Sequence, residues 1–99
     1  MPYIKSNWRE HFDDLVDKLV FELGEFEEMY ERPGAVNYVI SRIVASSLLA
    51  PNPSQRNYAS ISQALAIFRD AEAEMRRRVL DPYENKAIER NGDIPEYEE

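Results

Sequence analysis

The sequence contains no cysteine, a single histidine and only three glycines. Without cysteine there is no disulfide framework, no thiolate nucleophile and no thiolate ligand for a metal. The glycines are isolated, so they cannot form a Gly-rich phosphate loop or a nucleophile elbow. His11 leaves carboxylates as the other candidate metal ligands, and no calcium-loop spacing occurs. We therefore expect a protein that is not an enzyme, with no catalytic residues, no metal site and no cofactor.

Long hydrophobic runs are also missing. The most apolar stretch, residues 36–50, is interrupted by Arg42 and is shorter than the roughly 20 residues that a membrane helix needs. The first residues lack the basic region followed by an apolar segment that marks a secretory signal. These observations predict a cytoplasmic protein with no membrane association.

Acidic residues are missing from the middle of the chain. Residues 1–32 carry nine acids and four bases, residues 33–69 carry three arginines and no acid, and residues 70–99 carry ten acids and five bases. The net charge of −7 is evidence against direct nucleic-acid binding. Affinity for nucleic acid comes from neutralising many phosphates with basic side chains. A local arginine site for a small anion remains compatible with this pattern.

What the chain does contain is apolar and aromatic material at helical spacing. Its 99 residues are 43% apolar and 11% aromatic, which predicts one folded domain rather than a disordered chain. No strand-like alternation of useful length is present. The expected fold is all-α, a small bundle of three main helices plus a short C-terminal helix. Residues 1–6 are expected to form an extended arm and residues 93–99 a flexible acidic tail.

The first helix is predicted over residues 7–24. Asn7 followed by Glu10 is an approximate capping box. One apolar stripe recurs at helical spacing, and it consists of Trp8, Phe12, Leu15, Val16, Leu19 and Leu23.

The second helix is predicted from about Pro33 to Ala50, with apolar side chains on two sides. Successive residues of a helix are rotated by about 100°, so most of the apolar side chains fall on one side and the remainder fall nearly opposite. The first side comprises Val36, Val39, Ile40, Ile43, Val44 and Ser47, and the second Tyr38, Ala45 and Leu49. Because three helices cannot cover both sides, this helix favours self-association into a homo-oligomer.

The third helix is predicted to begin at a Ser60 cap and to run to about Leu80. Its stripe consists of Ile61, Leu65, Phe68, Met75 and Val79. Glu72 interrupts that stripe, where an unpaired carboxylate would be costly. Arg69 and Arg76 flank it at i−3 and i+4, so it forms either a structural ion pair or a ligand-directed acid.

The sequence DPYENKAIERNG predicts a short fourth helix. Asp81 as N-cap, Pro82 at the first position and Glu84 closing the box have the arrangement of a helix start. Gly92 supplies the stop. Alternatively, Pro82 kinks one long helix, because its ring clashes with the carbonyl of Arg78.

The candidate ligand-binding residues are polar groups near the second and third helices. Guanidinium groups bind phosphates bidentately and tyrosine stacks on bases, so an oligomer could hold a small nucleotide in a shared pocket. The candidates are Asn37, Tyr38, Ser41, Arg42, Glu72, Arg76 and Arg77. For the arginine run at 76–78 the alternative is an exposed basic turn that complements the helix dipole.

Three segments carry a family resemblance. The opening MPYIK, the middle NYVISR and the closing RRRVLDPYENKAIERNGD resemble a family of small uncharacterised proteins of tailed bacteriophages. The resemblance implies a compact phage product in the host cytoplasm, with no catalytic residue to transfer. Proteins of that kind often act by stoichiometric binding, either blocking a host protein or sequestering a signalling nucleotide used in antiviral defence.

Three functions are therefore expected in order. The first is a phage-type binding protein, in its sharpest form an anti-defence protein that sequesters a nucleotide. The second is a structural or assembly accessory protein, and the third an acidic mimic of DNA that inhibits a host protein. Arginines of the acid-free segment that converge on a cavity favour the first. Arginines in a flat apolar contact favour the second, and spaced rows of acids favour the third.

Overall fold

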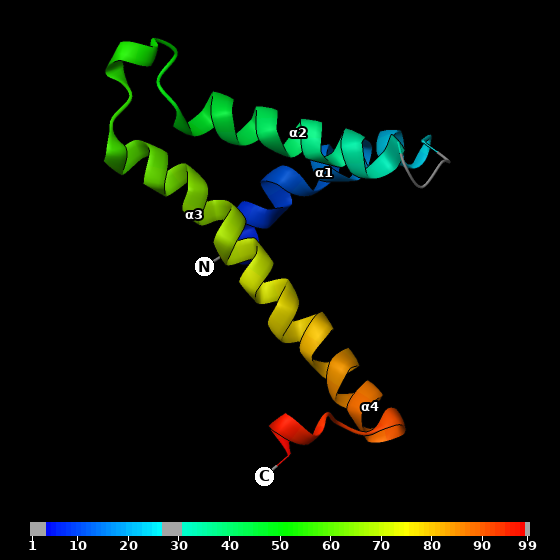
Figure 1. Ribbon diagram of the computed structural model, residues 1–99. Coiled ribbons are helices and arrows are strands. Elements are labelled where there is room, and N and C mark those ends of the chain that lie inside the picture. The colour runs from blue at the N-terminus through cyan, green and yellow to red at the C-terminus, as the bar shows by residue number, and fades with distance from the viewer. Residues whose placement is uncertain (1–3, 27–30, 99) are drawn as a thin grey trace.

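The computed structural model describes residues 4–26 and 31–98, and within these ranges the chain is helical with no strand. The α-helices are α1 (Ser6–Gly24), α2 (Glu31–Leu48), α3 (Tyr58–Met75) and α4 (Asp81–Asn91) (Figure 1). The predicted all-α class with three main helices is confirmed.

α1 begins one residue earlier than predicted and without the predicted cap. Lys5 occupies the N-cap position with extended backbone (φ −61°, ψ 149°), and no side chain caps the helix. The capping box of Asn7 and Glu10 is therefore wrong, because a capping residue must precede the helix and Asn7 already lies inside its first turn. Instead, Arg9 Nε donates to the carbonyl of Ile4 at 2.8 Å.

α2 includes Glu31, so the predicted start at Pro33 is two residues late. Pro33 is tolerated there because the first turn of a helix has no acceptor for its missing N–H. The helix ends at Leu48, two residues before the predicted Ala50, and a short 3₁₀ helix (Pro53–Gln55) follows in the loop.

α3 begins at a true capping box built by Asn57. The backbone N–H of Ser60 donates to Asn57 Oδ1 at 2.9 Å, and the N–H of Asn57 donates to Ser60 Oγ at 3.3 Å. Ser60 as N-cap is therefore wrong. Tyr58 and the residue after it are already helical, so Ser60 supplies the reciprocal half of the box.

α3 and α4 form one continuous rod through a π-helical turn, Arg76–Leu80 (Figure 1). Leu80 and Asp81 both have right-handed helical backbone, and the Asp81 N–H donates to the carbonyl of Arg76, five residues back. The new helix start with Asp81 as N-cap is therefore wrong, and the long-helix alternative is confirmed. The wider π turn accommodates Pro82, which would clash in an uninterrupted α-helix.

The rod stops at the predicted glycine. Gly92 has φ 83° and ψ 162°, and its N–H donates to the carbonyl of Ile88 at 2.7 Å. In the predicted tail, Pro95–Tyr97 forms a 3₁₀ helix. Of the predicted N-terminal arm, residues 1–3 lie outside the described residues, and Ser6 already belongs to α1.

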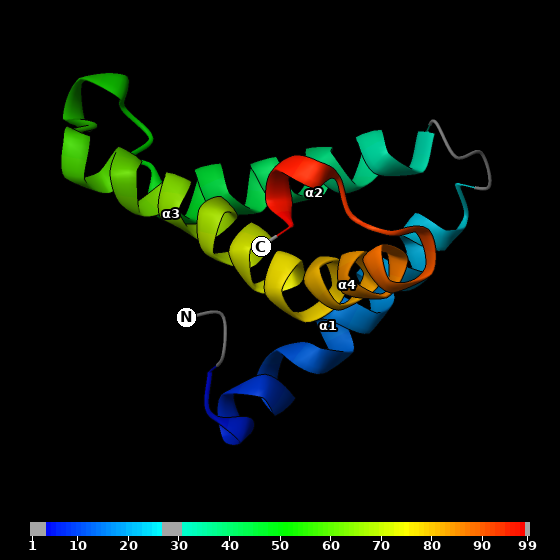
Figure 2. The same cartoon turned by 60° about the horizontal axis from the view of Figure 1, so that its bottom comes forward.

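The helices are arranged as an open assembly (Figures 1 and 2). α1 packs on α2 and α2 packs on α3, whereas α4 contacts only the π-helical turn among the described elements. The radius of gyration is 18.3 Å and the extents are 52 × 36 × 33 Å. A compact chain of this length would have a radius of gyration of about 13 Å.

The core is correspondingly small. Among the described residues only Val44 and Ala64, at the contact of α2 with α3, are buried, with 9% and 6% of their surface exposed. The apolar stripe of α1 is formed as predicted but is open to solvent, so that even Trp8 is 57% exposed. The chain exposes 9197 Å², against about 5,800 Å² for a compact protein of its mass.

Candidate functional site

Tyr38 and Arg42 lie together on α2. The Arg42 guanidinium carbon lies 5.9 Å from the centroid of the Tyr38 ring, a cation–π geometry that the i, i+4 spacing of a helix produces. Both line an open groove of about 410 Å³ between α1 and α2. The other lining residues are Leu19, Val39, Ile43, Ser46 and Ser47.

Asn37 and Ser41 form a separate pair on α2. The hydroxyl of Ser41 donates to Asn37 Oδ1 at 3.2 Å. Ser41 lines the groove between α2 and α3, on a different side of the helix from Arg42. The structure therefore does not bring the predicted hydrogen-bonding pair into the groove of Tyr38 and Arg42.

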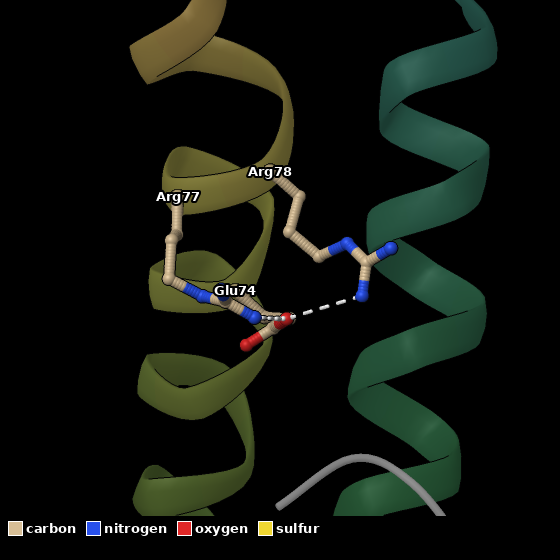
Figure 3. Close-up of polar contacts among 3 residues, drawn as sticks. All are labelled: Glu74, Arg77 and Arg78. Atoms are coloured by element: carbon tan, nitrogen blue, oxygen red, sulfur yellow. Dashed lines mark hydrogen bonds and ion pairs between the residues drawn. The ribbon is translucent and has the colours of Figure 1, made fainter.

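The predicted arginines of the rod bind carboxylates of the same helix. Arg76 contacts Glu72 Oε1 through Nε at 3.0 Å and Nη2 at 2.9 Å. Arg77 and Arg78 both reach Glu74 from the following turn, Arg78 at 3.8 Å (Figure 3). None of these three arginines lines the α1–α2 groove, so the predicted pocket is not assembled within one chain.

Of the two predictions for Glu72, a structural ion pair or an acid directed at a ligand, the structure shows the ion pair. The partner is Arg76 at i+4, and both side chains are about 60% exposed (60% and 61%). An exposed ion pair of this kind contributes roughly 0–1 kcal/mol to stability. Glu72 sits at the edge of the exposed apolar groove of the rod rather than in a buried site.

Two further arginines have roles that the sequence analysis missed. Arg56 Nε donates to the carbonyl of Ala50 at 2.9 Å and closes the loop between α2 and α3. Arg32 Nε donates to the carbonyl of Phe26 at 2.8 Å and ties α2 to the end of α1. Their position beside Pro-rich or Gly-containing connections is the signal that could have indicated these roles, since such loops leave carbonyls without helical partners.

The rod carries a bare apolar surface, which we call the distal stripe and define as Met75, Val79 and Tyr83. With Glu72, Arg76 and Leu80 it lines an open groove of about 430 Å³. The first half of the same helical stripe, at Leu65 and Phe68, lines the α2–α3 groove instead. The predicted stripe thus has two environments, one beside α2 and one open to solvent.

Other site chemistry is limited in the part of the chain that the structure describes. There, no three histidine, aspartate or glutamate side chains lie close enough together to hold a metal ion. The same residues include no helix with the length and hydropathy required to cross a membrane.

Comparison with known proteins identifies a family. The family model described as Domain of unknown function (DUF6899) matches residues 1–94. Neither the curated proteins nor the solved structures contain a significant match to the chain. Because the match spans nearly the whole sequence, from the residues before α1 to the residues after α4, the chain belongs to the DUF6899 family, whose function is unknown.

Proposed function

We propose that this protein acts by stoichiometric association, as a self-assembling, non-catalytic accessory protein whose working form is a homo-oligomer in the cytoplasm. The observation that carries the proposal is the exposed area of 9197 Å². It exceeds the area of a compact protein of the same mass by about 3,400 Å² per chain. Obligate interfaces bury about 2,000–5,000 Å² in total, so the excess is large enough for such an interface.

Energetics support the same conclusion. Fixing the backbone of one residue costs about 1–2 kcal/mol of entropy, which burial of apolar surface must offset. In residues 4–26 and 31–98, two buried side chains, Val44 and Ala64, provide little of that burial. Association with another copy would cover the exposed stripes and add the missing hydrophobic free energy, so that folding and assembly are coupled.

The arginines also favour assembly over a preformed ligand cavity. Arg42 lines the α1–α2 groove, whereas Arg56 closes a loop. They do not converge on one cavity of the single chain. The resemblance to phage proteins is consistent with a partner that is either the protein itself or a virion or host component.

The test is a mass measurement by light scattering after size exclusion, at protein concentrations of tens of micromolar. We expect a mass of at least twice the 11.6 kDa of the chain. A helical species of 11.6 kDa at these concentrations would overturn the proposal.

A second candidate function is sequestration of a small nucleotide, the anti-defence role. It is favoured by the groove in which the Arg42 guanidinium lies beside the Tyr38 ring and the hydroxyls of Ser46 and Ser47. A guanidinium binds phosphate, hydroxyls add hydrogen bonds and an aromatic ring stacks on a base.

Calorimetric titration with adenosine monophosphate tests this role, with inorganic phosphate as a second probe. Arg42→Ala is expected to abolish nucleotide binding without changing the circular dichroism spectrum. Arg69→Ala, on α3 outside the groove, is the matched control and should bind normally. Nucleotide binding that survives in Arg42→Ala, or native protein that binds neither probe, would exclude this role for the groove.

A further inference from the structure

The distal stripe is an apolar surface that no other described helix of its own chain covers. Met75, Val79 and Tyr83 recur every four residues on one side of the rod and are 68%, 64% and 64% exposed. The only described element that α4 contacts is the π-helical turn before it. Figure 1 shows this end of the rod projecting away from α2. Three large exposed side chains in one groove mark an interaction surface.

α2 has an apolar side of matching character. Val44 packs toward α3 and is buried, while Ile40 and Ile43 are 43% and 51% exposed. Ile40 lies about 40° and Ile43 about 100° around the helix from Val44, between the sides that face α3 and α1. We call Ile40 and Ile43, with the neighbouring Ser47, the free face of α2; Ile43 and Ser47 also line the edge of the α1–α2 groove.

The intrachain packing shows which surface complements the stripe. Within one chain, the first half of the rod's stripe lies beside α2, and Ala64 of α3 is buried there with Val44 of α2. The second half of that stripe is bare, and Ile40 and Ile43 of the free face of α2 are about half exposed. A second copy of α2 placed along the rod would give the second half of the stripe an apolar helix partner, as the first half already has, but through Ile40 and Ile43 rather than through the side at Val44 and Ala45.

Charge favours the same pairing. Residues 33–48, which form α2 after its first two residues, have one arginine and no acid. α4, at the end of the rod, has three acids and two bases. At the Tyr83 end of the stripe, rods that paired with each other would bring two net-negative α4 helices together, whereas α4 against this part of α2 joins opposite net charges.

We propose that the distal stripe of one chain packs on the free face of α2 in a second copy, and that the second copy returns the same contact. In a two-fold dimer this exchange occurs twice and covers both bare surfaces on both chains. The proposal rests on the self-association proposed above and names the surfaces that make it.

The absence of cysteine makes a crosslinking test specific. Ile40→Cys and Tyr83→Cys chains, one of them carrying a mass tag, are mixed in denaturant, refolded together and oxidised. The expected main product is the mixed disulfide between position 40 of one chain and position 83 of the other. Asp14→Cys, on the polar side of α1, is the control partner for Tyr83→Cys and should give at least tenfold less mixed product.

The products separate this inference from the proposed function. A dominant 83–83 or 40–40 disulfide in an oligomer would overturn the exchanged contact and leave self-association standing. A protein that remains at 11.6 kDa would overturn both.

A charged variant tests the same contact without a crosslink. Tyr83→Lys is expected to raise the dimer dissociation constant at least tenfold in sedimentation equilibrium. Tyr58→Lys replaces a tyrosine that is 87% exposed and lies outside both surfaces, so it should leave the constant unchanged. Equal association of the two variants would overturn the contact.

Discussion

At the scale of single residues, one asparagine fixes where α3 begins. Asn57 Oδ1 accepts the N–H of Ser60 at 2.9 Å, which satisfies one of the backbone donors that a helix start leaves unpaired. Asn57→Ala is expected to lower the free energy of unfolding by about 1 kcal/mol, measured by urea denaturation at fixed protein concentration. Asn85→Ala, inside α4, is the control and should not destabilise. Equal midpoints for the two variants would contradict the role of the cap.

Gly92 ends α4 in a backbone conformation that glycine adopts readily. Its φ of 83° with ψ of 162° is a backbone region essentially restricted to glycine. Gly92→Ala is expected to introduce strain of about 1–3 kcal/mol, which the chain relieves by fraying the end of α4. Amide exchange should therefore become faster at residues 88–92 while α1 and α2 keep native rates. Unchanged exchange at the end of α4 would count against strain at this position.

At the scale of elements, the rod depends on how the chain accommodates Pro82. The proline has no N–H and its ring would clash with the carbonyl of Arg78 in a regular α-helix, at a cost of about 3 kcal/mol. The π-helical turn Arg76–Leu80 precedes it and relieves that conflict. Pro82 is thus compatible with a continuous rod. The π-helical turn also changes the side of the rod on which Tyr83 lies.

Pro82→Ala should convert the π-helical turn into regular α-helix. The new N–H at position 82 can bond to the carbonyl of Arg78, so we expect slower amide exchange at residues 78–86 by nuclear magnetic resonance. Pro95→Ala, in the 3₁₀ helix after the rod, is the control and should leave these rates unaltered. Exchange rates at 78–86 that match the native protein would contradict the link between Pro82 and the π turn.

At the scale of the whole molecule, the open arrangement ties stability to protein concentration. The chain has a radius of gyration of 18.3 Å and, among its described residues, two buried side chains, so under the proposed self-association a second copy covers its apolar surface. Thermal unfolding between about 1 and 100 µM protein should therefore show a midpoint that rises by several degrees, because mass action favours the assembled state. A midpoint independent of concentration would show that a single chain is stable alone.

The sequence by itself determined the helices. Apolar spacing located α1, α2 and the rod, and Gly92 marked the last stop, since helical periodicity and glycine backbone freedom are local properties. The cap assignments at Asn7, Ser60 and Asp81 were wrong. Moving a helix start by one to three residues changes which side chain can reach a free N–H, and several polar residues compete near each start.

Only the tertiary structure decided how these helices use their apolar sides. Periodicity predicted a stripe on the rod, but not that Leu65 and Phe68 lie beside α2 while Val79 and Tyr83 stay bare. It placed Tyr38 and Arg42 together on one helix but could not show that Arg76 and Arg77 lie outside their groove, paired with carboxylates. Loop geometry and the directions of the helices set such distances, and these depend on contacts between residues far apart in the chain.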